Sequence, residues 1–426
     1  MSHPSLTPQD RILLPRSTTF AVIALGMTQI VAWGSSFYAL GVLGQPIVSD
    51  TGWDKATVFG GFTTAVLASS AVSTWAGRAI DRWGARGVMS AGFLALAASI
   101  YALSEVRTIW AYYTVWPVIG IAMRLTLYDA AFAAMVQVDP ANGRRAIAYL
   151  TLFGGFASTV GWTVGHALNE AVGWRDTLVI FAAANLIISL PLAWFGLPAE
   201  RKEASDDAAS PSEAATHVSK PLEGRARTIA MVLFSIVMSA NAFIFGVGAI
   251  HLVGIIEASG LALATAVGLA AMKGVAQVGG RLWELLFGRN LAPMMLGRIA
   301  IGLLPIAFCV LLMTTGNYFG ALAFTLIFGA SNGLVTIVRG AVPLALFGPA
   351  GYGTILGILA TPVLLFNAVS PLAFAALVDV AGYGAGAWVL LAISVLASVA
   401  MEVLCVWYRR RDQGSDESQD ARAPAP

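Results

Sequence analysis

Five ionisable side chains interrupt long apolar stretches of this chain: Arg124, Asp129, Lys273, Arg281 and Arg339. A charge that is withdrawn from water is costly, so each of these groups predicts a function and a partner. Four of the five are cations, and a buried cation is stabilised either by an acidic side chain or by an anionic ligand. The set therefore predicts an anion-binding site, with internal pairing to an acid as the alternative.

Arg124 and Lys273 lie at matching depths in their apolar stretches. Each is about 12 residues from one end of its stretch, which is roughly 18 Å along a helix. Gln277 and Arg281 follow Lys273 at spacings of four and eight, so these three side chains share one helix face. We expect Arg124, Lys273, Gln277 and Arg281 to bind an anionic solute.

Asp129 and Arg339 occupy equivalent places in two similar segments. Residues 126–131 (TLYDAA) align with residues 336–341 (TIVRGA) at an offset of 210. Opposite charges at equivalent positions predict an ion pair between two halves of the chain, which closes one mouth of a pathway and breaks when that mouth opens. Asp129 is also the preferred candidate for a coupling proton. A local pair with Arg124 is the alternative.

The composition shows which elements must position these groups. Hydrophobic residues make up 58% of the 426 residues and charged residues 11%, whereas a soluble domain carries about a quarter charged residues. The apolar residues form runs of about 20, the length that crosses a bilayer as a helix. The sequence therefore predicts an all-α polytopic membrane protein.

Other classes of protein lack support. Walker A, HExxH and GxSxG motifs are absent, and the two cysteines have no metal-ligand spacing. We therefore expect no enzyme, no ATP-driven pump, and no cofactor or metal. The net charge of +2 gives no reason to expect nucleic-acid binding.

Polar and Gly/Pro turns divide the chain into twelve expected spans. Lysines and arginines gather on the side of the N-terminus, which predicts that both termini are cytoplasmic. The expected spans are 18–43, 55–76, 87–105, 108–136, 145–169, 174–197, 227–252, 261–285, 291–315, 318–346, 353–378 and 383–408.

The expected spans fall into two groups of six. Residues 199–227 are polar, lack aromatic residues and read as a linker. Residues 167–174 resemble residues 376–383 at an offset of 209, which indicates two repeated bundles. The expected division is an N-terminal segment (1–17), a six-helix bundle (18–197), a linker (198–226), a second bundle (227–408) and a cytoplasmic tail (409–426).

A glycine-rich, charged turn between the second and third spans carries a recognisable pattern. Its sequence, AGRAIDRWGARG, resembles the loop signature of the major facilitator superfamily. The two six-helix repeats also resemble the plan of that superfamily. The resemblance implies that the turn is a conformational latch; setting the topology is the alternative role of its arginines. No equivalent acid follows the eighth span, so a single latch is expected. The latch residues are Gly77, Asp81, Arg82, Gly84 and Arg86.

Within that superfamily the chain is similar to the bacterial monocarboxylate and oxalate/formate porters. Asp50-Thr-Gly-Trp53 and the basic residues of span eight carry the likeness, and Arg281 falls where that group has a substrate arginine. The resemblance implies a solute pathway lined by spans one, four, seven and ten. The pathway residues that the resemblance suggests are Gln29, Trp33, Tyr38 and Asn241. For each of them, helix packing is the alternative role.

These observations predict a secondary transporter of the bacterial inner membrane. We expect a monomer that moves a small anion such as a monocarboxylate, as a symporter or antiporter, with a proton as the possible coupling ion. An efflux permease for a toxic drug or metalloid is the alternative, although span five lacks the Gly-Pro of the drug-antiporter signature.

Overall fold

A computed structural model describes residues 14–199, 221–288 and 290–420, with side chains as far as Arg411. Every regular element in these ranges is a helix. Several groups that the sequence places on the cytoplasmic side lie outside the described residues, together with most of the linker: Arg11, Arg201, Lys202, His217, Lys220 and Arg289.

The N-terminal bundle comprises the helices up to residue 196. Its last stretch includes a π-helical segment between α8 and α9. The elements are α1 (Arg16–Ser35), α2 (Ala39–Thr51), α3 (Lys55–Trp83), α4 (Ala85–Ser104), α5 (Ile109–Thr126), α6 (Tyr128–Val138), α7 (Gly143–Gly155), α8 (Ala157–Ala184), the π-helical Asn185–Ser189 and α9 (Leu190–Gly196).

The C-terminal bundle begins at residue 224. A second π-helical segment follows α12, and α15 comprises two helices that meet at a kink at Gly382. The elements are α10 (Gly224–Ile250), α11 (Leu252–Glu257), α12 (Leu263–Trp283), the π-helical Glu284–Gly288, α13 (Pro293–Met313), α14 (Tyr318–Phe347) and α15 (Tyr352–Asp420).

The predicted twelve crossings are confirmed. Nine described helical stretches are long and apolar enough to span a bilayer, and two of them have 54 and 60 residues, enough for two crossings each. The twelfth crossing is α12, which carries the polar side chains Lys273, Gln277 and Arg281.

Two glycines mark the repeat. Gly173 in α8 has φ 79° and ψ 169°, and Gly382 in α15 has φ 77° and ψ 168°. Both values lie in a region that residues with a Cβ rarely adopt, so a glycine lets the chain reverse between two crossings. Their separation equals the offset of 209 that the sequence comparison suggested, and the six-plus-six plan is therefore confirmed.

Two expected helices are interrupted. The first breaks after Ser35, where Ser35 and Ser36 hydroxyls donate to the carbonyl of Ala32 and compete with the backbone ladder. The fourth breaks at Leu127, whose ψ of −168° is extended. The break begins a new helix, α6, and places Asp129 in its first turn.

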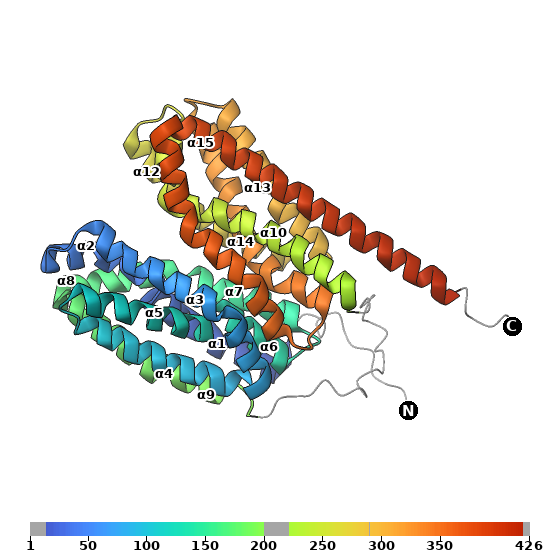
Figure 1. Cartoon of the computed structure of the whole chain (residues 1–426), viewed down its shortest axis with the longest axis horizontal. Coiled ribbons are helices and arrows are strands. Elements are labelled where there is room, and N and C mark those ends of the chain that lie inside the picture. Colours follow the sequence, from blue (N-terminus) through green and yellow to red (C-terminus); the bar gives the residue numbers. More distant parts are fainter. Residues whose placement is uncertain (1–13, 200–220, 289, 421–426) are drawn as a thin grey trace.

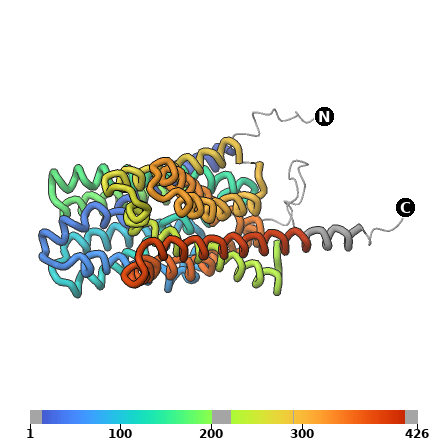
Figure 2. Tube along the Cα trace, turned by 90° about the horizontal axis from the view of Figure 1, so that it is seen from above, coloured from blue at the N-terminus to red at the C-terminus, as the bar shows by residue number. Residues whose placement is uncertain are grey.

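The two bundles lie side by side and meet at one end (Figure 1). We call this end the termini side, because the described chain begins and ends there; Figure 2 shows the helices running lengthwise from it. The described hydrogen bonds between the bundles involve the second half of α3, the first turn of α6, and the first three turns of α7 and of α15. At the opposite end the ribbons of the two bundles diverge.

Candidate functional site

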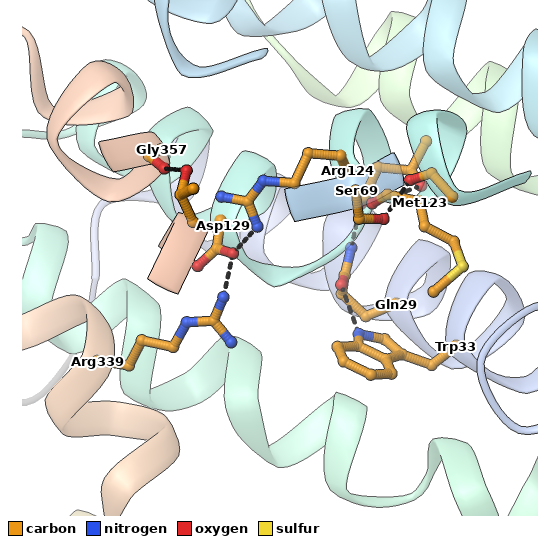
Figure 3. A network of polar contacts seen from close by, with 11 residues as sticks. Gln29, Trp33, Ser69, Met123, Arg124, Asp129, Arg339 and Gly357 are labelled. Atoms are coloured by element: carbon orange, nitrogen blue, oxygen red, sulfur yellow. Dashed lines mark hydrogen bonds and ion pairs between the residues drawn. The ribbon is translucent and has the colours of Figure 1, made fainter. Parts of the chain in front are cut away.

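Asp129 joins the two bundles. One of its carboxylate oxygens, Oδ2, accepts hydrogen bonds from Arg124 of α5 and from Arg339 of α14 (Figure 3). The pair between the halves and the local pair are therefore both present. Asp129 is 6% exposed, and one carboxylate serves two guanidinium groups, so this buried cluster has a net charge of +1. Its other oxygen, Oδ1, is buried without a hydrogen-bond partner.

For Arg124 this conformation shows the alternative, pairing with an internal acid, and the predicted contact with a solute stays a prediction. Its guanidinium is bound to Asp129, and the residue is 9% exposed. The physical reason is that a buried cation five residues from a buried carboxylate is stabilised by pairing with it once the break at Leu127 turns α6. Arg124 belongs to the cluster that joins the bundles.

Gln29 supports the break that positions Asp129. Its Nε2 donates to the backbone carbonyl of Thr126 at 2.9 Å, and its Oε1 accepts from Trp33 Nε1 at 3.1 Å. The carbonyl of Thr126 lies at the helix end, where intrahelical donors are lost. Gln29 is fully buried, and its side chain forms hydrogen bonds within and between helices. Its role in this structure is therefore helix packing, the alternative that the sequence left open.

Arg281 is the buried cation best placed for an anion. Its Nη1 donates to the carbonyl of Thr151 in α7 at 2.7 Å, and its Nη2 donates to Thr336 Oγ1 in α14 at 3.2 Å. It is 2% exposed, its Nε has no partner, and its described bonds go to neutral oxygens. None of the described contacts gives this guanidinium an acidic partner, so an anionic ligand would stabilise its buried charge.

Lys273 and Gln277 lie on the same helix face as Arg281. The Lys273 ammonium is 5.6 Å from the centre of the Phe328 ring, within the range of a cation–π interaction. Gln277 Oε1 accepts from Asn332 Nδ2 at 3.3 Å. Both contacts join α12 to α14, and neither gives Lys273 an acidic partner.

Aromatic side chains of the N-terminal bundle lie next to Arg281. Tyr128 Oη donates to the same Thr151 carbonyl that Arg281 binds. From Tyr128 a chain of ring contacts runs through Trp33 (5.1 Å between centroids) to Tyr38 (5.9 Å) and then to Trp162 (6.0 Å). The structure thus connects Trp33 and Tyr38 to Arg281 through Tyr128, as an aromatic wall whose successive rings are inclined by 35° to 80°.

None of the described hydrogen bonds connects the Asn241 side chain with Arg281 or with the aromatic residues beside it. It is 3% exposed in α10, and its Oδ1 is buried without a partner. The predicted solute contact at Asn241 therefore remains a prediction.

The glycine-rich turn holds the start of α15. The carboxylate of Asp81 accepts from the backbone nitrogens of Gly353 and Thr354 at 3.0 and 2.7 Å, and from Thr354 Oγ1 at 2.7 Å. A carboxylate at this place is favoured by the orphan N–H groups and the dipole of the helix.

The other residues of the turn have separate positions. Gly77 lies against Gly353, so closely that a Cβ at Gly77 would overlap the Gly353 carbonyl oxygen. Gly84 has φ 81° and separates α3 from α4. Arg86 stacks on Trp194 at 4.3 Å, and Arg82 lies 6.0 Å from the Trp83 ring. The arginines therefore contact aromatic residues of their own bundle.

The sequence did not predict a second ion pair between the bundles. Arg144 of α7 pairs with Glu284 at 3.3 Å, and it also donates to the carbonyls of Gly288 and Leu291. Glu284 is 2% exposed, although it lies near the end of a helix, where a carboxylate usually contacts water. The bundles are thus joined at a second place on the termini side. Glu284 follows Asp81 by 203 residues and so does not occupy the position aligned with it, and the single latch at the glycine-rich turn stays a prediction.

The signal that could have found it is the repeat offset. Gly143-Arg144 at the start of α7 and Gly353-Thr354 at the start of α15 are 210 residues apart. Each start binds an acid at the end of a helix in the other bundle: Asp81 binds Thr354, and Glu284 binds Arg144. The starts of α7 and α15 thus correspond by their positions in the two repeats, although their residue types differ.

Comparison with known proteins settles the family. A profile described as the Major Facilitator Superfamily matches residues 25–337, well over half of the chain. The chain belongs to the Major Facilitator Superfamily. It is accordingly a membrane transporter of a small-molecule solute and not an enzyme.

Solved structures agree on the fold of this superfamily. The human organic anion transporter MFSD10 (TETRAN) is 16% identical with a TM-score of 0.67, and the match covers 93% of this chain and 100% of that chain. The transporter FucP in its outward conformation is 13% identical with a TM-score of 0.69, covering 91% and 99%. None of the curated proteins matches the chain. At these identities the likeness concerns the fold alone.

Proposed function

We propose that this superfamily member is a secondary active transporter for a small organic or inorganic anion such as a monocarboxylate. The observation that carries the proposal is Arg281, which is buried at the junction of the bundles with neutral hydrogen-bond partners and an unsatisfied Nε. A carboxylate would form two charge-assisted hydrogen bonds with such a guanidinium. The resemblance to the monocarboxylate and oxalate/formate porters agrees with an anionic solute, as does the similarity to MFSD10, an organic anion transporter.

The residues around Arg281 then have distinct roles. Lys273 adds a second positive charge on the same helix face, and Gln277 supplies hydrogen bonds. Trp33 and Tyr38 form the aromatic wall against which the solute's carbon skeleton packs. Asn241 is proposed as a further contact from the C-terminal bundle. A solute bound here touches both bundles, as alternating access requires.

The Asp129 cluster is proposed as the gate on the termini side. While Asp129 binds Arg339 the bundles are held together there, and the pathway opens at the opposite end. Protonation of Asp129 removes the charge that both arginines share, which favours separation of the bundles. A proton is therefore the proposed coupling ion, and Asp81 acts as a second latch through α15.

The termini side is proposed to face the cytoplasm of a bacterial cell, with the protein a monomer in the inner membrane. The described lysines and arginines at the ends of the spans support this orientation, since positive residues are enriched on the cytoplasmic side. Among them Arg144 and Arg86 lie at helix starts on the termini side.

A thermal-shift screen tests the proposed solute class. Purified protein is heated with small carboxylates, inorganic oxyanions and cationic drugs. We expect stabilisation by one group of anions that is lost in Arg281→Gln and retained in Arg298→Gln, an arginine in the same bundle that pairs with Glu402. Stabilisation by cations instead of anions would overturn the proposal.

The aromatic wall supports a second candidate function, an efflux permease for a toxic small compound. Trp33, Tyr38 and Trp162 could stack on a flat drug without help from Arg281. In that case the screen would show stabilisation by drugs that depends on Trp33 and persists in Arg281→Gln.

A further inference from the structure

A groove runs along the outside of the C-terminal bundle, between α13 and the last crossing of α15. Its volume is about 590 Å³, and it lies away from Arg281 and from the contacts between the bundles. Pro305 contributes from α13, and the remaining lining residues come from α15 between Val395 and Arg410. The transport mechanism proposed above does not use this groove.

The groove has an apolar floor. Val395, Val399, Val403 and Val406 line it at spacings of four, four and three, so they share one face of the helix. Each of them is about half exposed in a crossing helix, with Val399 at 54%. Because this face has no protein neighbour covering it within the described residues, its surroundings are the acyl chains of the bilayer.

Polar groups gather toward one end of the groove. Glu402 lies in its wall and accepts from Arg298 Nε at 2.7 Å, which ties α13 to α15. Beyond it, Trp407 and Arg410 form the rim on the termini side. The charges of Arg298 and Glu402 balance, so Arg410 is the unbalanced charge among the residues that line this end.

The dimensions suit one lipid molecule. Val395 and Arg410 are 15 residues apart in one helix, or about 22 Å, and half of a bilayer including its headgroups is also about 20–22 Å. Tryptophan is enriched at the level of the headgroups, and arginine there attracts anionic lipids. Trp407 and Arg410 thus mark the headgroup end, and the valines mark the acyl end.

We propose that this groove is a binding site for one anionic phospholipid of the leaflet on the termini side. The phosphate lies at Arg410 beside Trp407, and an acyl chain lies along Val406, Val403 and Val399. Arg410 sits eight residues beyond Glu402, about 12 Å, which keeps the phosphate clear of the carboxylate. The bound lipid braces α13 against α15 on the face that looks away from the solute pathway.

Native mass spectrometry of the full chain in detergent tests this proposal. The probes are phosphatidylglycerol and phosphatidylethanolamine with identical acyl chains. We expect one phosphatidylglycerol per protein, retained at least fivefold better than phosphatidylethanolamine. Val399→Trp fills the groove and should lower retention at least fivefold, whereas Leu396→Trp, on an exposed position of the same helix outside the groove, should leave it unchanged.

A charge variant tests the headgroup separately. Arg410→Gln should abolish the preference for phosphatidylglycerol, and Arg411→Gln, which removes the same charge one residue away, should preserve it. Equal retention of both lipids by the unmodified protein, or unchanged retention in Val399→Trp, would overturn the proposal. So would an equal effect of Arg411→Gln and Arg410→Gln, or a protein dimer that Val399→Trp dissociates, because the occupant would then be a second copy.

Discussion

Asp129 and Arg339 are 210 residues apart, occupy equivalent positions in the two repeats, and form an ion pair across the junction of the bundles. Repeated bundles usually place similar residues at such positions, whereas here the two copies carry opposite charges. The pair exists while the bundles are together on the termini side. Because the pair can form only while the bundles are together, breaking it favours their separation on the termini side.

Replacing Asp129 tests its part in closure. Asp129→Asn removes the charge that holds Arg124 and Arg339, and breaking a buried ion pair on one side costs roughly 3–5 kcal/mol. We expect the bundles to separate on the termini side. Leu344, which packs close to Gly143 of the other bundle, can be changed to cysteine in a background without Cys309 and Cys405. Its labelling by a membrane-impermeant maleimide should become several-fold faster.

Two further variants complete that experiment. Arg339→Gln should accelerate labelling in the same direction, since it breaks the same pair from the other bundle. Asp50→Asn disturbs an ion pair with Arg175 inside the N-terminal bundle and should leave the rate unchanged. If labelling in Asp129→Asn matches the unmodified protein, the Asp129 cluster does not close this end.

A double-mutant cycle measures the second contact between the bundles. Arg144→Gln and Glu284→Gln should each lower the melting temperature of the purified protein, because each leaves a partly or fully buried charge without its partner. The double variant should lose less than the sum of the two, with a coupling of about 0.5–3 kcal/mol. Strict additivity would show that the contact contributes nothing to holding the bundles together.

The close approach of α3 and α15 depends on Gly77. A Cβ there would overlap the Gly353 carbonyl oxygen, so Gly77→Ala forces the helices apart, and overpacking of this kind costs about 1–3 kcal/mol. We expect a lower melting temperature and faster labelling at Leu344→Cys. A Cβ at Gly87 would have no heavy atom within 4 Å, so Gly87→Ala offers the matched control. Equal behaviour of the two variants would contradict a role for this approach.

Much of the fold could be predicted because a bilayer leaves few choices. A backbone in hydrocarbon must form helices, so hydropathy located the twelve crossings, and Gly173 and Gly382 confirmed the repeat. The breaks after Ser35 and at Leu127 could not be predicted from hydropathy. They depend on local competition for carbonyls and on Gln29, which comes from another helix to bind Thr126.

The candidate site was predictable in part for a similar reason. Charges in apolar stretches are conspicuous, so Asp129, Arg281 and Arg339 could be singled out, and the offset of 210 suggested the pair. Glu284 escaped because it lies near a helix end, where a carboxylate usually meets water. Its burial follows from the packing of α7 against α12, a tertiary contact that no local pattern records.

The buried guanidinium of Arg281 is the group on which the anionic solute depends. Calorimetric titration of purified protein with the most stabilising carboxylate measures that dependence directly. Removing one partner of a buried charge pair costs at least about 2 kcal/mol, so Arg281→Gln should bind at least about thirtyfold more weakly, with Arg298→Gln unchanged. An Arg281→Gln protein that binds the carboxylate with full affinity would contradict the account.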